Sequence, residues 1–159
     1  MSALAHMLHV TTGAQTLNPS ALATAARRLA SEVDQVRILS PDKDLIQCLC
    51  GERVVLVDRQ RQRTMDEATF RATRGFAPAS IPDFLALTGD SADGIPGLPG
   101  FGDKSAALLL GAYGQLERIP EKAEHWSVPV RRAPHLASVL VEQRAQALLY
   151  RKLATLVFH

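Results

Sequence analysis

Residues 95–107 read Ile95-Pro96-Gly97-Leu98-Pro99-Gly100-Phe101-Gly102-Asp103-Lys104-Ser105-Ala106-Ala107, and this stretch is the most informative in the chain. Gly97, Gly100 and Gly102 lie close together in it. Glycine allows positive φ values and a close approach of the backbone to a partner. The stretch therefore predicts a tight hairpin whose backbone can contact a ligand.

The residues around these glycines predict a phosphate-binding function for the hairpin. A helix is predicted over 104–113, and the free N–H groups at its start suit an anion. Lys104 adds a positive charge there, Ser105 adds a hydroxyl, and Leu98 and Phe101 are expected to anchor the hairpin in the core. The Gly-Lys-Ser spacing differs from that of a nucleotide-binding P-loop. The pattern is typical of a helix–hairpin–helix element, which holds the DNA backbone without reading its sequence; a plain connection between two helices is the alternative.

Two carboxylate pairs stand outside the hairpin. Asp42 and Asp44 follow a predicted strand, where α/β folds bind ligands, and such a pair can hold a hard cation. Asp90 and Asp93 lie on a predicted turn between Gly89 and Gly94. The alternative is structural: Asp42 caps the helix that starts at Lys43, and the other pair bonds to nearby backbone groups.

The first half of the chain predicts an α/β unit. Residues 1–17 show no clear period, and Asn18-Pro19 predicts a helix start. Short strands are predicted over 36–40 and 54–57, with a crossover that favours a parallel sheet. A polar basic connection follows, carrying Arg59, Arg61 and Arg63.

The second half predicts a cluster of helices. One is expected over 81–88, ended by Gly89, and a single last helix from about Pro134. The last helix carries an apolar stripe that is expected to face the core, comprising Val141, Ala145, Leu148, Leu149, Leu153 and Leu156. We therefore expect two regions, a sheet-containing one over 1–79 and a helical one over 80–159.

Two ordered blocks of sequence resemble the DNA 5′-nuclease family, the 5′-3′ exonucleases and flap endonucleases that include the 5′-nuclease domain of bacterial DNA polymerase I. The family pattern Gly-Asp-Lys-Asp-Leu is matched by Pro41-Asp42-Lys43-Asp44-Leu45. The pattern Asp-Tyr-Leu-Ala-Leu-x-Gly-Asp-x-x-Asp-Asn-Ile-Pro-Gly is matched by residues 83–97, which run directly into the hairpin. Residues 113–117 and 152–156 also look like family segments.

The resemblance implies a fold, an activity and a set of site residues. The implied fold is α/β, a truncated PIN-like parallel sheet with helices, followed by a helix–hairpin–helix (helix-three-turn-helix) DNA-binding cluster. The implied activity is metal-dependent 5′-3′ exonuclease or flap phosphodiester hydrolysis in DNA repair and replication. Asp42, Asp44, Asp90 and Asp93 match metal ligands for magnesium or manganese, and the residues matching DNA contacts are Gly97, Gly100, Gly102, Lys104 and Ser105. A monovalent cation at the hairpin is also implied.

The sequence departs from the family at one ligand motif. The family has Glu-Ala-Asp-Asp where this chain has Leu17-Asn18-Pro19-Ser20, so three carboxylates are absent. Its earlier strands, which carry further ligand aspartates, are expected to be missing. Three explanations stay open: a fragment or wrongly started gene product, a remnant that grips duplex or flap DNA without cutting it, and an enzyme that cleaves weakly with one metal ion.

Bulk composition limits the remaining options. The chain has 159 residues and 47% hydrophobic content, which suits a single globular unit with a real core. The net charge is only +2, so any DNA contact must come from local charge, and a sequence-independent, salt-sensitive contact is expected. No apolar run is long enough to span a bilayer, and a cytoplasmic protein is expected. A partner chain that completes the core is a further hypothesis.

Overall fold

The computed structural model describes residues 7–11, 19–59 and 61–157. The chain divides into two compact units, Met1–Arg71 with Leu156–His159, and Ala72–Thr155. The first contains the sheet and the second is helical, so the predicted α/β fold class is confirmed. No helix within the described residues is long and apolar enough to cross a membrane.

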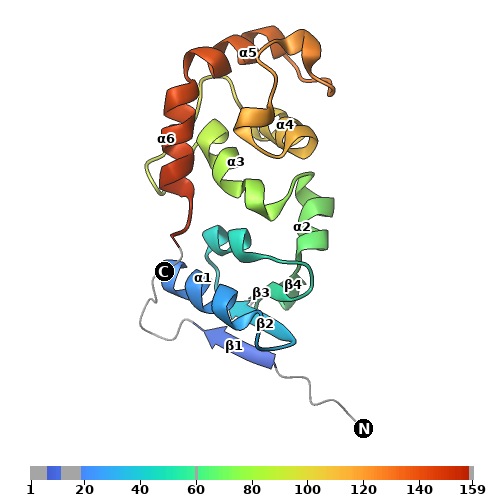
Figure 1. Cartoon of the computed structure of the whole chain (residues 1–159), viewed down its shortest axis with the longest axis vertical. Helices are drawn as coiled ribbons and strands as arrows, with labels where there is room; N and C mark the ends of the chain where they lie inside the picture. Colours follow the sequence, from blue (N-terminus) through green and yellow to red (C-terminus); the bar gives the residue numbers. More distant parts are fainter. Residues whose placement is uncertain (1–6, 12–18, 60, 158–159) are drawn as a thin grey trace. The chain divides into compact units, whose positions relative to one another are not determined.

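The first unit is built on a four-stranded sheet (Figure 1). Its strands are β1 (Met7–Thr11), β2 (Gln35–Leu39), β3 (Val54–Asp58) and β4 (Arg63–Met65), in the order β1-β2-β3-β4. The pairs β1–β2 and β2–β3 are parallel, as expected for strands joined by crossovers, and β3–β4 is antiparallel.

The helix α1 (Pro19–Leu29) and the 3₁₀ helix η1 (Lys43–Cys48) supply the core of this unit. The helix starts at Pro19 as predicted, whereas the proposed cap Asn18 lies outside the described residues. The α1, η1 and sheet side chains that pack together are Leu22, Ala23, Ala26, Val36, Ile38, Leu45 and Val54. This core positions the loop that follows β2, where the first carboxylate pair lies.

Two details of the first unit differ from the sequence predictions. The strand β1 was not predicted, because residues 1–17 show no period; it forms by pairing in register with β2, from Met7 against Gln35 to Thr11 against Leu39. The prediction of a basic connection at Arg59, Arg61 and Arg63 is wrong in part, because Arg63 belongs to β4 and lies opposite Asp58 in the strand pairing. A polar run can form an exposed edge strand, since such a strand needs little apolar surface.

The second unit is a set of helices that follow α2 (Glu67–Arg74), a helix that runs from one unit into the other. The predicted helices are confirmed as α3 (Ile81–Thr88), capped by Gly89, and α4 (Asp103–Tyr113), capped by Gly114. Short 3₁₀ helices lie at Pro78–Ser80 (η2), Leu116–Arg118 (η3) and Ala123–His125 (η4).

The predicted single last helix is wrong, because the chain forms α5 (Ala133–Glu142) and α6 (Arg144–Ala154) with a break at Gln143. The break changes which residues face inward. Val141 is 46% exposed, Leu149 54% and Leu153 67%, so the predicted core stripe is wrong at these positions. The buried residues of the two helices are Leu136, Ala137, Val139, Leu140, Ala147 and Ala154. No proline or glycine marks the break, so periodicity alone did not reveal it.

Candidate nucleic-acid interface

The first carboxylate pair lies just after β2. Asp42 caps η1, because its Oδ1 accepts a hydrogen bond from the Asp44 N–H at 2.9 Å. The Asp42 N–H in turn donates to the buried Ser40 hydroxyl at 3.2 Å. Both aspartates are half-buried. The prediction that Asp42 caps the following helix is therefore confirmed. This cap uses the Oδ1 atom of Asp42.

The second pair lies on the turn between α3 and the hairpin. The backbones of Asp90 and Ile95 exchange two hydrogen bonds of 2.8 Å, which closes the turn. Asp90 Oδ1 accepts from the Ala92 N–H at 2.9 Å. Asp93 stands exposed at the tip. Asp90 thus has a local structural role as well.

The two pairs lie in different compact units, and each is described by itself. Among the described residues, no group of three or more histidine, cysteine, aspartate or glutamate side chains is placed to hold a metal ion. Within its own unit, each pair offers two carboxylates.

The hairpin has the geometry that its glycines predicted at two of three positions. Gly97 has φ +72° and Gly100 has φ +82°. Leu98 is 4% exposed and Phe101 8%, which confirms that they anchor the hairpin in the core. The Leu98 N–H donates to the Leu87 carbonyl at 2.8 Å, which ties the hairpin to the end of α3.

Gly102 corrects the third position. Its φ of −124° and ψ of 171° are extended, and a Cβ built there would meet no atom within 4 Å. Gly102 instead forms the N-cap of α4, where Ser105 Oγ accepts from its N–H at 3.1 Å and donates to its carbonyl at 2.9 Å. Positive φ is therefore not the reason for a glycine at this position.

The start of α4 carries charges of both signs. Lys104 is exposed, as the phosphate-binding prediction requires. Asp103 stands beside it, with its carboxylate 3.9 Å from Arg74 Nη2. Arg74 also lies over the Phe84 ring, 5.1 Å from the centroid, and Phe84 stacks on Phe76 at 4.9 Å. Arg74 therefore partly neutralises Asp103 beside the proposed phosphate site.

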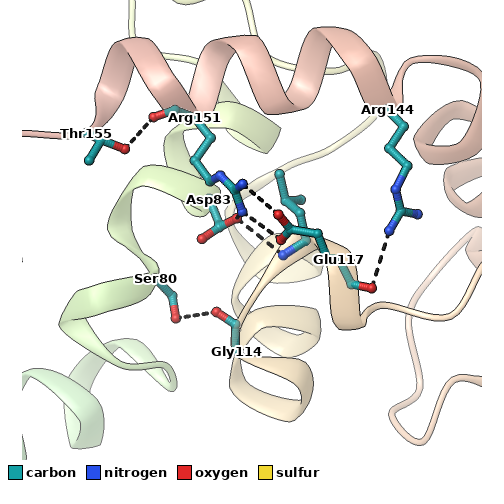
Figure 2. A network of polar contacts seen from close by, with 8 residues as sticks. Ser80, Asp83, Gly114, Glu117, Arg144, Arg151 and Thr155 are labelled. Atoms are coloured by element: carbon teal, nitrogen blue, oxygen red, sulfur yellow. Dashed lines mark hydrogen bonds and ion pairs between the residues drawn. The ribbon is translucent and has the colours of Figure 1, made fainter.

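An ionic network around one buried carboxylate supports this unit (Figure 2). Asp83 on α3 is 4% exposed, and its Oδ1 accepts from the Leu116 N–H and from Arg151 Nη1, both at 3.2 Å. Arg151 on α6 also donates two bonds of 2.6 Å to Glu117. The network thereby joins α3, η3 and α6. No sequence pattern predicted this network; the one signal for it is the carboxylate of Asp83 inside an otherwise apolar helix.

The network shifts the pKa values of its acids in opposite directions. Burial raises the pKa of Asp83, and the Leu116 N–H and Arg151 offset this only in part. The hydrogen bonds from Arg151 lower the pKa of Glu117. In the folded protein, burial therefore disfavours the ionised form of Asp83, and Arg151 supplies the opposite charge beside it.

The remaining candidate residues have structural roles or stay open. Trp126 is buried and donates to the Pro120 carbonyl at 2.8 Å, so its indole packs against the rest of the unit. Cys48 and Cys50 are free thiols, and burial raises the pKa of Cys48 to about 11, which keeps it protonated. Arg59 and Arg61 are exposed, and Arg61 Nη1 lies 3.5 Å from Asp58 Oδ2. A solvated basic face and a phosphate contact remain the two predictions for them.

Comparison with known proteins identifies the family. Residues 76–159 match the family model described as 5′-3′ exonuclease, C-terminal SAM fold. The chain is 37% identical to DNA polymerase I of Pseudomonas aeruginosa over 143 residues, which are 85% of this chain and 15% of the relative. It is 35% identical to the 5′-3′ exonuclease of Aquifex aeolicus over 112 residues, which are 70% of this chain and 38% of the relative.

A solved structure shows the same fold. The bacteriophage T5 flap endonuclease, in a pseudo-enzyme-product complex with DNA and metal ions, matches with a TM-score of 0.69 and 16% identity. The match covers 87% of this chain and 49% of the phage chain. This chain thus spans less than half the length of each of these proteins. The family model and the two relatives agree, and the chain belongs to the 5′-3′ exonuclease family.

Proposed function

We propose that this chain binds duplex or 5′-flap DNA through the hairpin, independently of sequence, as part of a metal-dependent 5′-3′ exonuclease or flap endonuclease. In this proposal residues 80–159 are the DNA-binding region and residues 1–79 are the nuclease core. The observation that carries it is the exposed backbone of the hairpin directly before the start of α4.

The hairpin suits a DNA backbone for three physical reasons. Gly97 and Gly100 turn the chain in conformations that side-chain-bearing residues adopt rarely, and Gly100 is exposed. The first turn of α4 presents N–H groups and the positive end of the helix dipole. Lys104 adds an exposed cation. The named phage relative, which shares the fold, was captured with DNA.

The aspartates fit an oxygen-preferring divalent ion such as magnesium or manganese. We propose Asp42 and Asp44 as metal ligands in the first unit and Asp90 and Asp93 as metal ligands in the second. Asp42 and Asp90 each give one oxygen to a backbone N–H and keep the second for a cation. A bound divalent ion would supply an activated water and stabilise the leaving oxygen of the phosphodiester.

Binding without cleavage is the second candidate, and one observation favours it. Residues 17–20 carry no carboxylate where the resembled motif has three. A chain with this ligand deficit retains the hairpin, α4 and Lys104 intact. The same chain would then grip duplex or flap DNA without hydrolysing it.

A partner chain that completes the core is a further proposal. The strand β1 lies at one edge of the sheet, and an edge strand presents unpaired N–H and C=O groups to another strand. Mass measured in solution at increasing protein concentration tests this. A mass that stays at that of one chain, alone and with DNA, argues against it.

The experiment that tests the main proposal measures binding and cleavage on one substrate. An end-labelled 5′-flap DNA is incubated with the purified chain in magnesium or manganese, with Asp42→Ala as the variant. Binding by both proteins and cleavage by the unsubstituted chain alone support the enzyme. Binding by both with no cleavage by either, in protein shown to be folded, supports the second candidate. No binding by either protein overturns both.

A further inference from the structure

The start of α5 lies directly against the proposed DNA-binding hairpin. A Cβ built on Gly100 would lie 3.4 Å from His135 Nε2 and 3.4 Å from Leu136 Cδ2. Leu136 is buried, whereas His135 is exposed beside the glycine. Residues 131 and 132 therefore lie within a few positions of this contact, although they follow the hairpin by some thirty residues along the chain.

Those residues form a turn with two adjacent arginines. The Ala133 N–H donates to the Val130 carbonyl at 3.2 Å, and the Leu136 N–H donates to the Arg132 carbonyl at 3.1 Å. Arg132 itself has φ 61° and ψ 29°, the left-handed conformation. A left-handed arginine is uncommon and costs roughly 1 kcal/mol or more. The turn defines the backbone conformation at Arg131 and Arg132, just before α5.

Both arginines are exposed, and their charge is not neutralised within the described part of the second unit. Neither guanidinium makes a hydrogen bond or an ion pair there. By contrast, Arg151 pairs with Glu117 and Asp83, and Arg74 Nη2 lies 3.9 Å from the Asp103 carboxylate. Arg131 and Arg132 therefore keep two positive charges available to an external anion.

We propose that Arg131 and Arg132 bind phosphates of the same DNA backbone that the hairpin contacts, and so extend that contact along the duplex. The proposal rests on the DNA-binding role of the hairpin and adds a second contact to it. Guanidinium groups suit this role because they remain charged and can bond to two phosphate oxygens at once. The contact recognises phosphates, so it adds affinity and salt dependence without adding sequence preference.

The test measures the dissociation constant against salt concentration for two duplexes of unrelated sequence, by fluorescence anisotropy. The main variant is Arg131→Ala with Arg132→Gly, because glycine adopts the left-handed conformation of residue 132 without strain. Arg131→Lys with Arg132→Lys keeps the charges. Arg27→Ala with Arg28→Ala is the matched control, since it removes two adjacent exposed arginines from α1 in the other unit. Circular dichroism verifies that each variant is folded.

We expect the main variant to bind both duplexes more weakly by roughly tenfold or more. We also expect the slope of log K against log salt to fall in magnitude by about 1.8, which is two phosphate contacts at about 0.9 each. The lysine variant should keep the slope, and the α1 control should resemble the unsubstituted chain.

Different outcomes separate this proposal from the one on which it rests. If the unsubstituted chain binds neither duplex, the DNA-binding function itself is wrong. If it binds, Lys104→Ala weakens binding and the main variant has no effect, the hairpin role stands and the arginine contact is wrong. An equal loss in the α1 control would also overturn the arginine contact, because net charge would then explain the effect.

Discussion

The backbones of Gly97 and Gly89 are in direct contact at the base of the hairpin. A Cβ built on Gly97 would stand 2.5 Å from the Gly89 nitrogen and 2.6 Å from the Thr88 carbonyl carbon. A Cβ built on Gly89 would stand 2.8 Å from the carbonyl oxygens of Ile95 and Pro96. Backbone packs on backbone here, so neither position has room for a side chain. This contact fixes the hairpin against the end of α3.

Gly97→Ala should destabilise the second unit by about 2 kcal/mol or more. An alanine at position 97 cannot adopt φ +72° without strain. The atoms that its methyl group would meet are backbone atoms, which cannot rotate aside. Urea unfolding measures the loss. Gly102→Ala is the matched control, because residue 102 is extended and open. A similar loss in both variants would show that the close contact at Gly97 is not the cause.

Lys104→Ala should weaken DNA binding equally on all sequences. The Lys104 side chain is exposed at the start of α4, where it can contact a phosphate. A phosphate contact carries no sequence information, because sequence is read at the base edges in the DNA grooves. The salt slope should fall by about 0.9, as expected for one lost phosphate contact. Anisotropy titrations on duplexes of unrelated sequence check this. A changed sequence preference would contradict the backbone-binding role of the hairpin.

The sequence predicted elements best where one local signal was sufficient. Helix α3 ends just before Gly89 and α4 just before Gly114, because glycine terminates a helix locally, and the sequence predicted both ends. The strand β1 depends on pairing with β2, which is not a local signal. The break at Gln143 interrupts a continuous apolar period and has no sequence marker.

The candidate site was predictable in its residue types and less so in its local geometry. Gly97 and Gly100 have the predicted positive φ, but Gly102 does not. The role of Asp83 was missed, because its partners Leu116 and Arg151 lie far along the chain and no spacing rule joins them. Long-range polar contacts of this kind follow from the packing of α3 against α6, which only the structure shows.

Arg151→Ala should destabilise the protein by about 3 kcal/mol, near the lower end of the range for breaking a buried ion pair, because Arg151 is partly exposed. Among the described residues, the variant leaves the buried Asp83 carboxylate with the Leu116 N–H as its one remaining hydrogen-bond partner. Thermal or urea unfolding measures the loss. Arg71→Ala is the matched control, because it breaks an exposed Arg71–Glu67 pair on α2 and should cost less than about 0.5 kcal/mol.

The instability of Arg151→Ala should depend on pH in a defined direction. Burial raises the pKa of Asp83 in the folded state, so this group favours folding below its unfolded pKa and loses that contribution as pH rises through the folded value. Without Arg151 the pKa of Asp83 should rise further. Arg151 lowers the pKa of Glu117, whose contribution is present at neutral pH and lost as pH falls through the folded value. That contribution is absent in the variant.

Both effects act in the same sense, so the difference in unfolding free energy between the unsubstituted chain and Arg151→Ala should shrink from about pH 7 to about pH 4. Urea unfolding at each pH measures the difference. Comparing Asp83→Asn with the double variant Asp83→Asn, Arg151→Ala removes the Asp83 titration from both proteins, so only the smaller Glu117 dependence should remain. A difference that stays constant over this range would mean that Arg151 stabilises the unit through the packing of its aliphatic stem, since packing, unlike the charge on Asp83, does not titrate.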